Sequence, residues 1–273
     1  MQLRRIAFFL VTVLPLSLGA AQGLPSQSQT SEQVAVTPPA QHQVEPPASN
    51  ASAVDLEKRG DELRANKYYL DAVDYYRAAL AKKPDDPQIL NKLGIAELLL
   101  TRYKEARKSF EHAIKHEHDY ADARNNLGVI YYIEKKYPKA IKEYERAITL
   151  RPDAASFYSN LGAAYFSKKE FEKAVAAYSK ALQLDPDVFE RTSHSGVAAQ
   201  MAKPEDRAHY DYVLAKLYAQ SGATDRSLEY LRKAMEDGYK GIDNVYKDAE
   251  FTNLRKDPRF AALMAAKPPA IPD

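Results

Sequence analysis

Small apolar residues recur every 34 positions through the middle of the chain. Three columns share this step, and they hold Gly60, Gly94, Gly128 and Gly162; Ala72, Ala106, Ala140 and Ala174; and Ala79, Ala113, Ala147 and Ala181. Two aromatic columns keep the same step, and they hold Tyr69, Tyr103, Tyr137 and Phe171, and Tyr76, Phe110, Tyr144 and Tyr178. A fixed period of this length predicts one supersecondary unit repeated along the chain.

Each unit has the pattern of two antiparallel helices. In the third unit, Ala140, Ile141, Tyr144 and Ala147 fall on one face of a 3.6-residue helix. Pro138 stands in the first turn of that helix, where the missing N–H costs nothing. We expect the glycine and alanine columns to mark close helix contacts and the aromatic columns to fill the gaps between hairpins. The second helices should end before Pro84, Pro152 and Pro186.

These residues resemble the tetratricopeptide repeat (TPR). The third unit carries it in Leu127, Gly128, Tyr131, Ala140, Tyr144, Ala147 and Pro152, and the fourth in Leu161, Gly162, Tyr165, Ala174, Tyr178, Ala181 and Pro186. The resemblance covers residues 53–188 as four contiguous repeats. It implies an all-α fold, a right-handed superhelical solenoid of helical hairpins.

The chain continues beyond the fourth repeat. Residues 189–207 interrupt the period and are predicted to be an insertion loop. Residues 208–241 form a fifth TPR-like repeat, because Ala215 precedes Ser227 by the same 12 positions as Gly60 precedes Ala72. Residues 242–273 are predicted to be a C-terminal helical cap and tail, anchored by Phe251, Leu254, Phe260 and Leu263.

The amino terminus has the order of a secretory signal peptide. Arg4 and Arg5 precede an apolar run, and small residues follow as far as Ala21. The run is shorter than the roughly 20 apolar residues that cross a membrane, so no stable span is expected after cleavage. Residues 1–21 therefore predict export to a periplasmic or extracellular location. Residues 22–52 are rich in Gln, Ser and Pro and predict a disordered linker.

Composition narrows the chemistry further. The net charge is +2, and removal of Arg4 and Arg5 with the signal peptide leaves 2 − 2 = 0, so nucleic acid is not an expected partner. There is no cysteine, which excludes disulfides, thiolate metal sites and a thiol nucleophile. No cofactor-binding motif is present in the sequence.

Two local groups invite a chemical interpretation. His112 and His116 stand four apart on a predicted helix and, with Asp119 nearby, have the spacing of metal ligands. The helix period instead makes His112 an exposed residue and His116 a substitute for a packed Leu, so we predict no metal site. The run from Ser193 through His194 to Ser195 is only adjacent in sequence, whereas a catalytic triad needs convergence in space. We predict that the protein is not an enzyme.

The resemblance implies a concave channel lined by the first helices, in which a peptide or partner helix binds. Carried over onto this sequence, the peptide-binding residues are Asn91, Ile95, Leu98, Asn125, Asn126, Val129, Tyr132, Asn160 and Phe166. In the alternative interpretation, Asn126 and Asn160 satisfy neighbouring helices and the aromatic residues pack between repeats. The basic clamp that some family members use for a carboxy terminus is absent, since Glu57, Asp61 and Asp122 stand at its positions.

The sequence thus predicts an exported scaffold that binds a polypeptide segment in its groove. An alternative of another class is a structural envelope module that self-associates without a dedicated peptide ligand.

Overall fold

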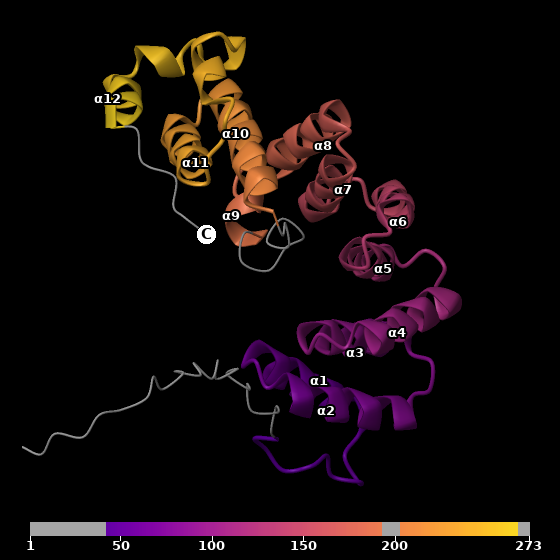
Figure 1. Cartoon of the computed structure of the whole chain (residues 1–273). Helices are drawn as coiled ribbons and strands as arrows, with labels where there is room; N and C mark the ends of the chain where they lie inside the picture. Colours follow the sequence, from indigo (N-terminus) through magenta and orange to yellow (C-terminus); the bar gives the residue numbers. More distant parts are fainter. Residues whose placement is uncertain (1–41, 193–202, 267–273) are drawn as a thin grey trace, which may run out of the picture. The chain divides into compact units, whose positions relative to one another are not determined.

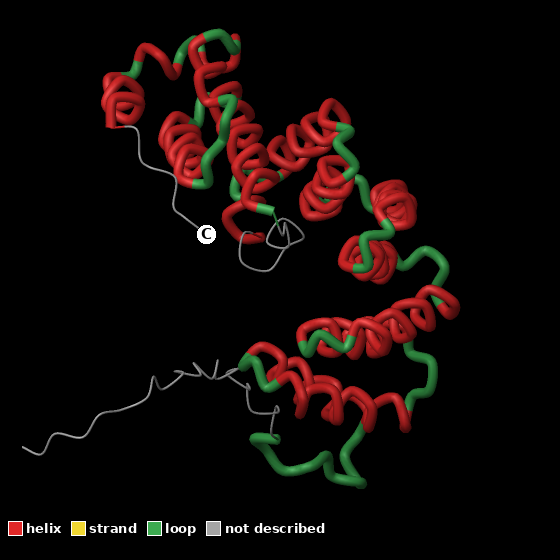
Figure 2. The backbone as a smooth tube through the Cα atoms, viewed as in Figure 1, coloured by secondary structure: helices red, strands yellow, loops and turns green. Residues whose placement is uncertain are grey.

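The computed structural model describes residues 42–192 and 203–266, and Figure 2 shows helices joined by short loops from residue 53 onward within these ranges. Four hairpins come first, built from α1 (Ala53–Ala65) and α2 (Tyr69–Lys82), α3 (Pro87–Leu99) and α4 (Tyr103–His116), α5 (Ala121–Ile133) and α6 (Tyr137–Leu150), and α7 (Ala155–Ser167) and α8 (Phe171–Leu184). Successive hairpins pack on one another in chain order (Figure 1). The fold is an all-helical stack, which confirms the predicted fold class.

A fifth hairpin and a helical end follow. Their elements are α9 (Val188–Thr192), α10 (Pro204–Gln220), α11 (Thr224–Glu236), the short 3-10 helices η2 (Ile242–Tyr246), η3 (Ala249–Phe251) and η4 (Leu254–Lys256), and α12 (Pro258–Ala266). The predicted anchors Phe251, Leu254, Phe260 and Leu263 are all buried. No helix in the described ranges is both long and apolar enough to cross a membrane.

The glycine column marks the closest contact inside each hairpin. A Cβ atom built on Gly128 would lie 2.5 Å from the ring of Tyr144, which is fully buried on the facing helix. Gly60, Gly94 and Gly162 meet Tyr76, Phe110 and Tyr178 in the same way. These four rings therefore pack within their hairpins, whereas the column was expected to fill gaps between hairpins. Tyr178 does both, because it also packs against Phe189 and Tyr210 beyond its own hairpin.

A second repeated device turns each first helix into its second helix. Lys67, Thr101, Lys135, Lys169 and Gly222 all have positive φ. The N–H of Lys135 bonds to the carbonyl of Tyr132, and the next N–H reaches back to Tyr131. These paired bonds satisfy the last helix carbonyls and end the helix at one defined residue. The second helix of each hairpin therefore starts from the same kind of turn.

Residues 42–52 differ from the prediction of a disordered linker over residues 22–52. The backbone N–H groups of Gln43 and Val44 donate to the carboxylate of Asp71 at 3.1 and 3.3 Å. Asp71 is buried on α2, and a buried carboxylate needs such donors to offset the loss of water. The last part of the leader is thus held on the first hairpin.

The predicted insertion also needs correction. Residues 188–192 form α9, and Val188 and Phe189 are buried, the latter against the rings of Tyr178 and Tyr210. The fifth hairpin begins at Pro204, four residues before the predicted boundary at 208, because Pro204 is favourable in a first helical turn. The remaining insertion residues, 193–202, lie outside the described ranges, as do the signal peptide and the tail after 266.

We predict that Gly128→Ala lowers the free energy of unfolding by about 1–3 kcal/mol, because the added methyl group overlaps the Tyr144 ring. Urea unfolding followed by circular dichroism measures the change. Without an overlap, alanine would stabilise the helix by about 1 kcal/mol, so a more stable variant contradicts the prediction. Adding Tyr144→Leu should remove the overlap and make the alanine less costly than it is in the wild-type background.

Candidate functional site

The first helices α1, α3, α5, α7 and α10 contact one another in chain order, and we call the surface that they share the first-helix face. Polar bonds join neighbouring repeats along it. At its amino-terminal end, Lys92 of α3 reaches Glu57 and Asp61 of α1, each at 2.6 Å. The ammonium group is therefore neutralised by two carboxylates. Asp122, which stands at another position of the family's basic clamp, is paired with Arg151. The three clamp positions Glu57, Asp61 and Asp122 therefore hold acids, and the bases that pair with them are not free to bind a carboxylate.

Four asparagines continue the same pattern through the second, third and fourth repeats. Asn126 donates to the side-chain oxygen of Asn91 at 3.0 Å, and Asn160 donates to that of Asn125 at 2.9 Å. Asn125 donates to Asn126 at 3.3 Å, and Asn91 donates to the hydroxyl of Tyr120. We call this chain of amides the asparagine ladder. It holds adjacent first helices in register.

The ladder changes the roles expected for these amides. Asn91 and Asn125 are only 5% and 8% exposed, while Asn126 and Asn160 are partly buried. An amide has two N–H donors and one oxygen acceptor with two lone pairs, and all four side chains engage part of this capacity within the ladder. Asn91 and Asn125 therefore line the interior of the face rather than open surface. Asn126 and Asn160 bond to residues of the preceding first helices, as the alternative interpretation expects of them.

The expected aromatic anchors are buried as well. Tyr132 is 5% exposed, and its hydroxyl lies 2.9 Å from that of Ser167 in the next repeat. Phe166 is 3% exposed and packs against the rings of Phe171 and His209. Both side chains hold repeats together, which corrects the expectation that they offer an apolar surface to a ligand.

The other predicted residues are the aliphatic ones. Ile95 and Leu98 of α3 and Val129 of α5 are partly buried and pack against the core with one side. They leave a shallow apolar strip beside the ladder. These three side chains, with Asn126 and Asn160, are the members of the predicted set that keep partial access to solvent.

A pocket of about 540 Å³ opens at the carboxy-terminal end of the stack. Its walls come from α8, α10 and the segment from residue 239 to 250. The lining residues used below are Phe171, Glu172, Val175, His209, Tyr212, Lys216, Tyr239, Asp248 and Glu250. None of them was predicted as a site residue.

Aromatic rings form one wall of this pocket. His209 packs against Phe171 at 4.6 Å between ring centroids and stacks on Tyr239 at 5.6 Å. Tyr239 also stacks on Tyr212 at 4.5 Å. Phe171 and Val175 each remain 36% exposed, a large fraction for apolar side chains that line a pocket. An apolar or aromatic ligand group would cover them.

The repeat pattern agrees with known families. Residues 128–169 match a family model described as TPR repeat, and residues 58–117 and 155–188 match models described as tetratricopeptide repeat. The chain contains tetratricopeptide repeats. Repeats of this kind form scaffolds that are typically non-catalytic.

Several solved structures are similar to this chain. PilF of Pseudomonas aeruginosa is 18% identical, with a TM-score of 0.53, and the match covers 79% of this chain and 88% of that chain. The thermophilic TPR protein TTC0263 of Thermus thermophilus is 22% identical over 78% of this chain and 100% of that chain, with a TM-score of 0.49. MamA of Desulfovibrio magneticus RS-1 is 21% identical over 74% and 100%, with a TM-score of 0.49. Comparison with curated proteins gives no match.

The TPR register explains why the pocket escaped prediction. Tyr212 precedes Ala215 by three residues, as Asn91 precedes Gly94, and Lys216 occupies the place of Ile95. The same columns that were followed through repeats two to four thus reach the pocket in repeat five. Applying them across the insertion would have found the α10 residues. The residues after α11 follow no repeat and carried no such signal.

The charges of the pocket are mainly negative. Lys216 lies 3.1 Å from both Asp248 and Glu250, and the hydroxyl of Tyr212 donates to Asp248 at 2.9 Å. Burial acts to lower the pKa of Lys216, but hydrogen bonds to the two carboxylates raise it overall, so Lys216 stays charged. Burial lowers the pKa of His209, which keeps the ring neutral at pH 7. With Glu172, the lining of the pocket holds three carboxylates and one ammonium group.

Of the residues that suggested chemistry in the sequence, Ser193, His194 and Ser195 lie outside the described ranges. Asp119 is not part of a metal-ligand group, but His112 and His116 do approach another carboxylate, that of Asp85. This group belongs to α4 and the turn before α3, and it shares no residue with the pocket.

We predict that Asn125→Ala lowers the free energy of unfolding by about 1–3 kcal/mol, because it removes the donor to the side-chain oxygen of Asn126 and the acceptor of the partly buried Asn160 amide. Chemical denaturation compares it with Ser156→Ala, a change at an exposed position on α7 that should be neutral. Equal stability of both variants would show that the ladder does not hold the repeats together.

Proposed function

We propose that this protein is an exported, non-catalytic scaffold that binds a polypeptide segment along its first-helix face, with the pocket of the fifth repeat as the main anchor. The observation that carries the proposal is the pocket itself. It combines the exposed apolar side chains of α8 with stacked rings and carboxylates, and its α10 residues Tyr212 and Lys216 lie on columns that run along the rest of the face.

The lining of the pocket favours a particular kind of peptide. Phe171 and Val175 offer apolar surface to an aliphatic or aromatic side chain, whose burial contributes about 25 cal/mol per Å². The excess of carboxylates over Lys216 favours a neighbouring Lys or Arg. The rings of Tyr212 and Tyr239 also suit a cation, since an aromatic face attracts positive charge. We therefore expect a segment that pairs an apolar side chain with a basic one.

The rest of the face supports extended rather than deep binding. The asparagine ladder is largely occupied by its own bonds, while Ile95, Leu98 and Val129 form a shallow strip. A peptide anchored in the pocket would gain weak contacts along this strip. In protein interfaces a few residues commonly supply most of the binding energy, while the surrounding contacts contribute little.

The test begins with peptides selected by display against the purified protein, and their affinities are measured by fluorescence anisotropy. Phe171→Ser combined with Val175→Ser should weaken binding by tenfold or more, because it removes exposed apolar surface without emptying the core. Glu250→Lys should weaken basic peptides in particular. Tyr132 and Phe166 are unsuitable for this test, since their loss would disturb the packing of the repeats.

The matched control is Leu150→Ser, which removes an exposed apolar side chain at the end of α6, away from the lining of the pocket. Its affinity should equal that of the wild type. If the pocket variants bind as tightly as this control, the anchor is wrong. If selection yields no peptide and light scattering shows oligomers, the self-associating structural module becomes the better interpretation.

Export is the second part of the proposal, and residues 1–21 support it through their charged, apolar and small-residue order. Expressed in a host with the ordinary secretory route, the mature protein should begin at Gln22 and appear in the exported fraction. Mass spectrometry of cell fractions measures this. Leu10→Asp, which interrupts the apolar run, should leave an uncleaved chain inside the cell. Processing that is unaffected by this variant would argue against a signal peptide.

A further inference from the structure

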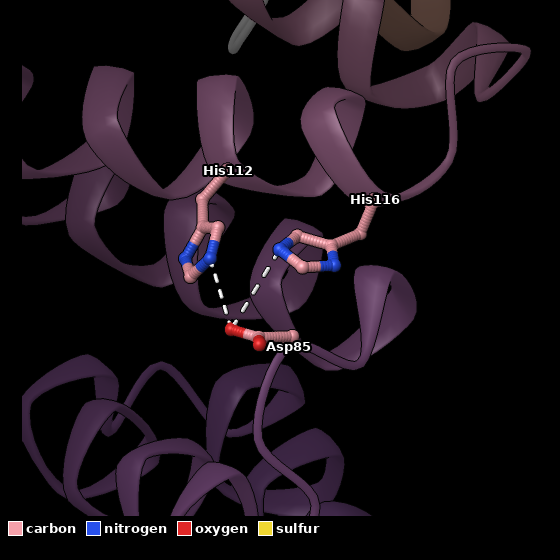
Figure 3. A group of neighbouring side chains, drawn as sticks. All are labelled: Asp85, His112 and His116. Atoms are coloured by element: carbon pink, nitrogen blue, oxygen red, sulfur yellow. Dashed lines mark ion pairs between the residues drawn. The ribbon is translucent and has the colours of Figure 1, made fainter.

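Three side chains converge beside the second hairpin, outside the first-helix face. Figure 3 shows His112 and His116 leaving the same helix, α4, and pointing toward Asp85 in the turn between α2 and α3. Nε2 of His112 lies 2.9 Å and Nε2 of His116 lies 3.8 Å from the same oxygen, Oδ1 of Asp85. We call these three residues the His–Asp cluster.

The repeat pattern does not require this cluster. The place of His112 holds Ala78, Arg146 and Lys180 in the other repeats, and the place of His116 holds Leu150 and Leu184 in the next two. Packing at these places is therefore satisfied by residues that bind no metal. Two histidines one helical turn apart are a departure confined to the second repeat among the first four.

The turn that carries Asp85 is also distinctive. Asp85 has a φ of 66°, which is left-handed backbone. Its counterparts one and two repeats later are also aspartates, Asp119 and Asp153, but their φ is not positive. The left-handed turn therefore accompanies the one aspartate that faces two imidazoles.

The separations fit a tetrahedral metal ion. Bonds of roughly 2.0–2.2 Å from zinc to nitrogen and oxygen place two ligand atoms about 3.3–3.5 Å apart. The observed separations of 2.9 and 3.8 Å lie on either side of this value, and the three donor atoms all lie within 4.8 Å of one another. Small side-chain rotations would bring them to equal distances from an ion.

Access and charge are suitable as well. The side chains of Asp85, His112 and His116 are 49%, 43% and 33% exposed, so an ion can enter and a water molecule can complete the coordination. Imidazole nitrogen with one carboxylate oxygen selects zinc and neighbouring transition metals, whereas calcium and magnesium prefer oxygen ligands alone.

We propose that Asp85, His112 and His116 bind a divalent transition metal ion, with Zn²⁺ as the best match, through two imidazole nitrogens and one carboxylate oxygen. The bound ion ties the turn before α3 to the carboxy-terminal end of α4. It thereby stiffens the second hairpin against the turn that joins it to the first. This site is independent of the peptide pocket.

Isothermal titration of the full chain with ZnCl₂ tests the proposal, with MgCl₂ as the comparison salt. Zinc should bind at one equivalent and magnesium should not bind. At about a hundredfold excess of zinc over its dissociation constant, the melting temperature should rise by roughly 5 °C or more relative to chelator-treated protein. Co²⁺ should give the visible absorption bands of tetrahedral coordination.

The variants use residues that the repeat already accepts. His112→Ala introduces the residue of the first repeat, and His116→Leu that of the third and fourth, so both should fold. Each should weaken zinc binding by tenfold or more and abolish the cobalt spectrum. Asp85→Asn should weaken binding to a smaller extent, because an amide oxygen is a poorer ligand than a carboxylate.

The controls are His118→Ala and Asp119→Asn. His118 lies near the cluster in sequence, but its Nδ1 is 2.9 Å from the carbonyl of Ile114, and Asp119 is not part of the group. Both variants should bind zinc as the wild type does. Absence of zinc binding, or equal binding by His112→Ala, His116→Leu and the controls, would overturn the proposal and indicate adventitious binding elsewhere.

Discussion

The architecture of the four contiguous repeats depends on the contact between a glycine in each first helix and an aromatic ring in the facing second helix. At Gly128, even one methyl group would meet the Tyr144 ring at 2.5 Å, and the same overlap recurs in the other three hairpins of the contiguous array. The ring fills the space that a side chain at the glycine position would need, so the two helices approach closely at the level of the glycine. The four contiguous hairpins then share one close contact at equivalent positions, and each packs on the next in chain order.

Regular stacking has a consequence for the polar residues of the first-helix face. Because equivalent residues of adjacent repeats come close together, a side chain in one repeat bonds to a residue 35 positions earlier, as Lys92 does to Glu57 and Asn160 does to Asn125. Most of the amides that suggested a peptide site in the sequence are used in this way. The two sites proposed for ligands therefore lie where the repeat pattern changes, one at the fifth repeat and one at the histidines of the second repeat.

The two proposed sites arise from different kinds of change. The pocket forms because the fifth hairpin is followed by short helical turns rather than another repeat, and these turns bring Tyr239, Asp248 and Glu250 to α10. The His–Asp cluster forms inside the regular array, by substitution at positions that packing leaves free. The scaffold tolerates both changes because each repeat contacts mainly its neighbours, so a local variation does not propagate along the stack.

The sequence by itself determined the helical hairpins of the first four repeats and the glycine, alanine and aromatic columns of their core, because helix periodicity and close packing leave a direct record in residue type and spacing. It also marked His112 and His116 as an unusual pair. Only the tertiary structure decided that Asp85 rather than Asp119 faces this pair, that Tyr132 and Phe166 are buried, and that the residues after α11 complete a pocket. These features depend on contacts between segments that share no period. The distances between such segments are set by how the helices pack in three dimensions, and residue spacing along the chain does not reveal this packing.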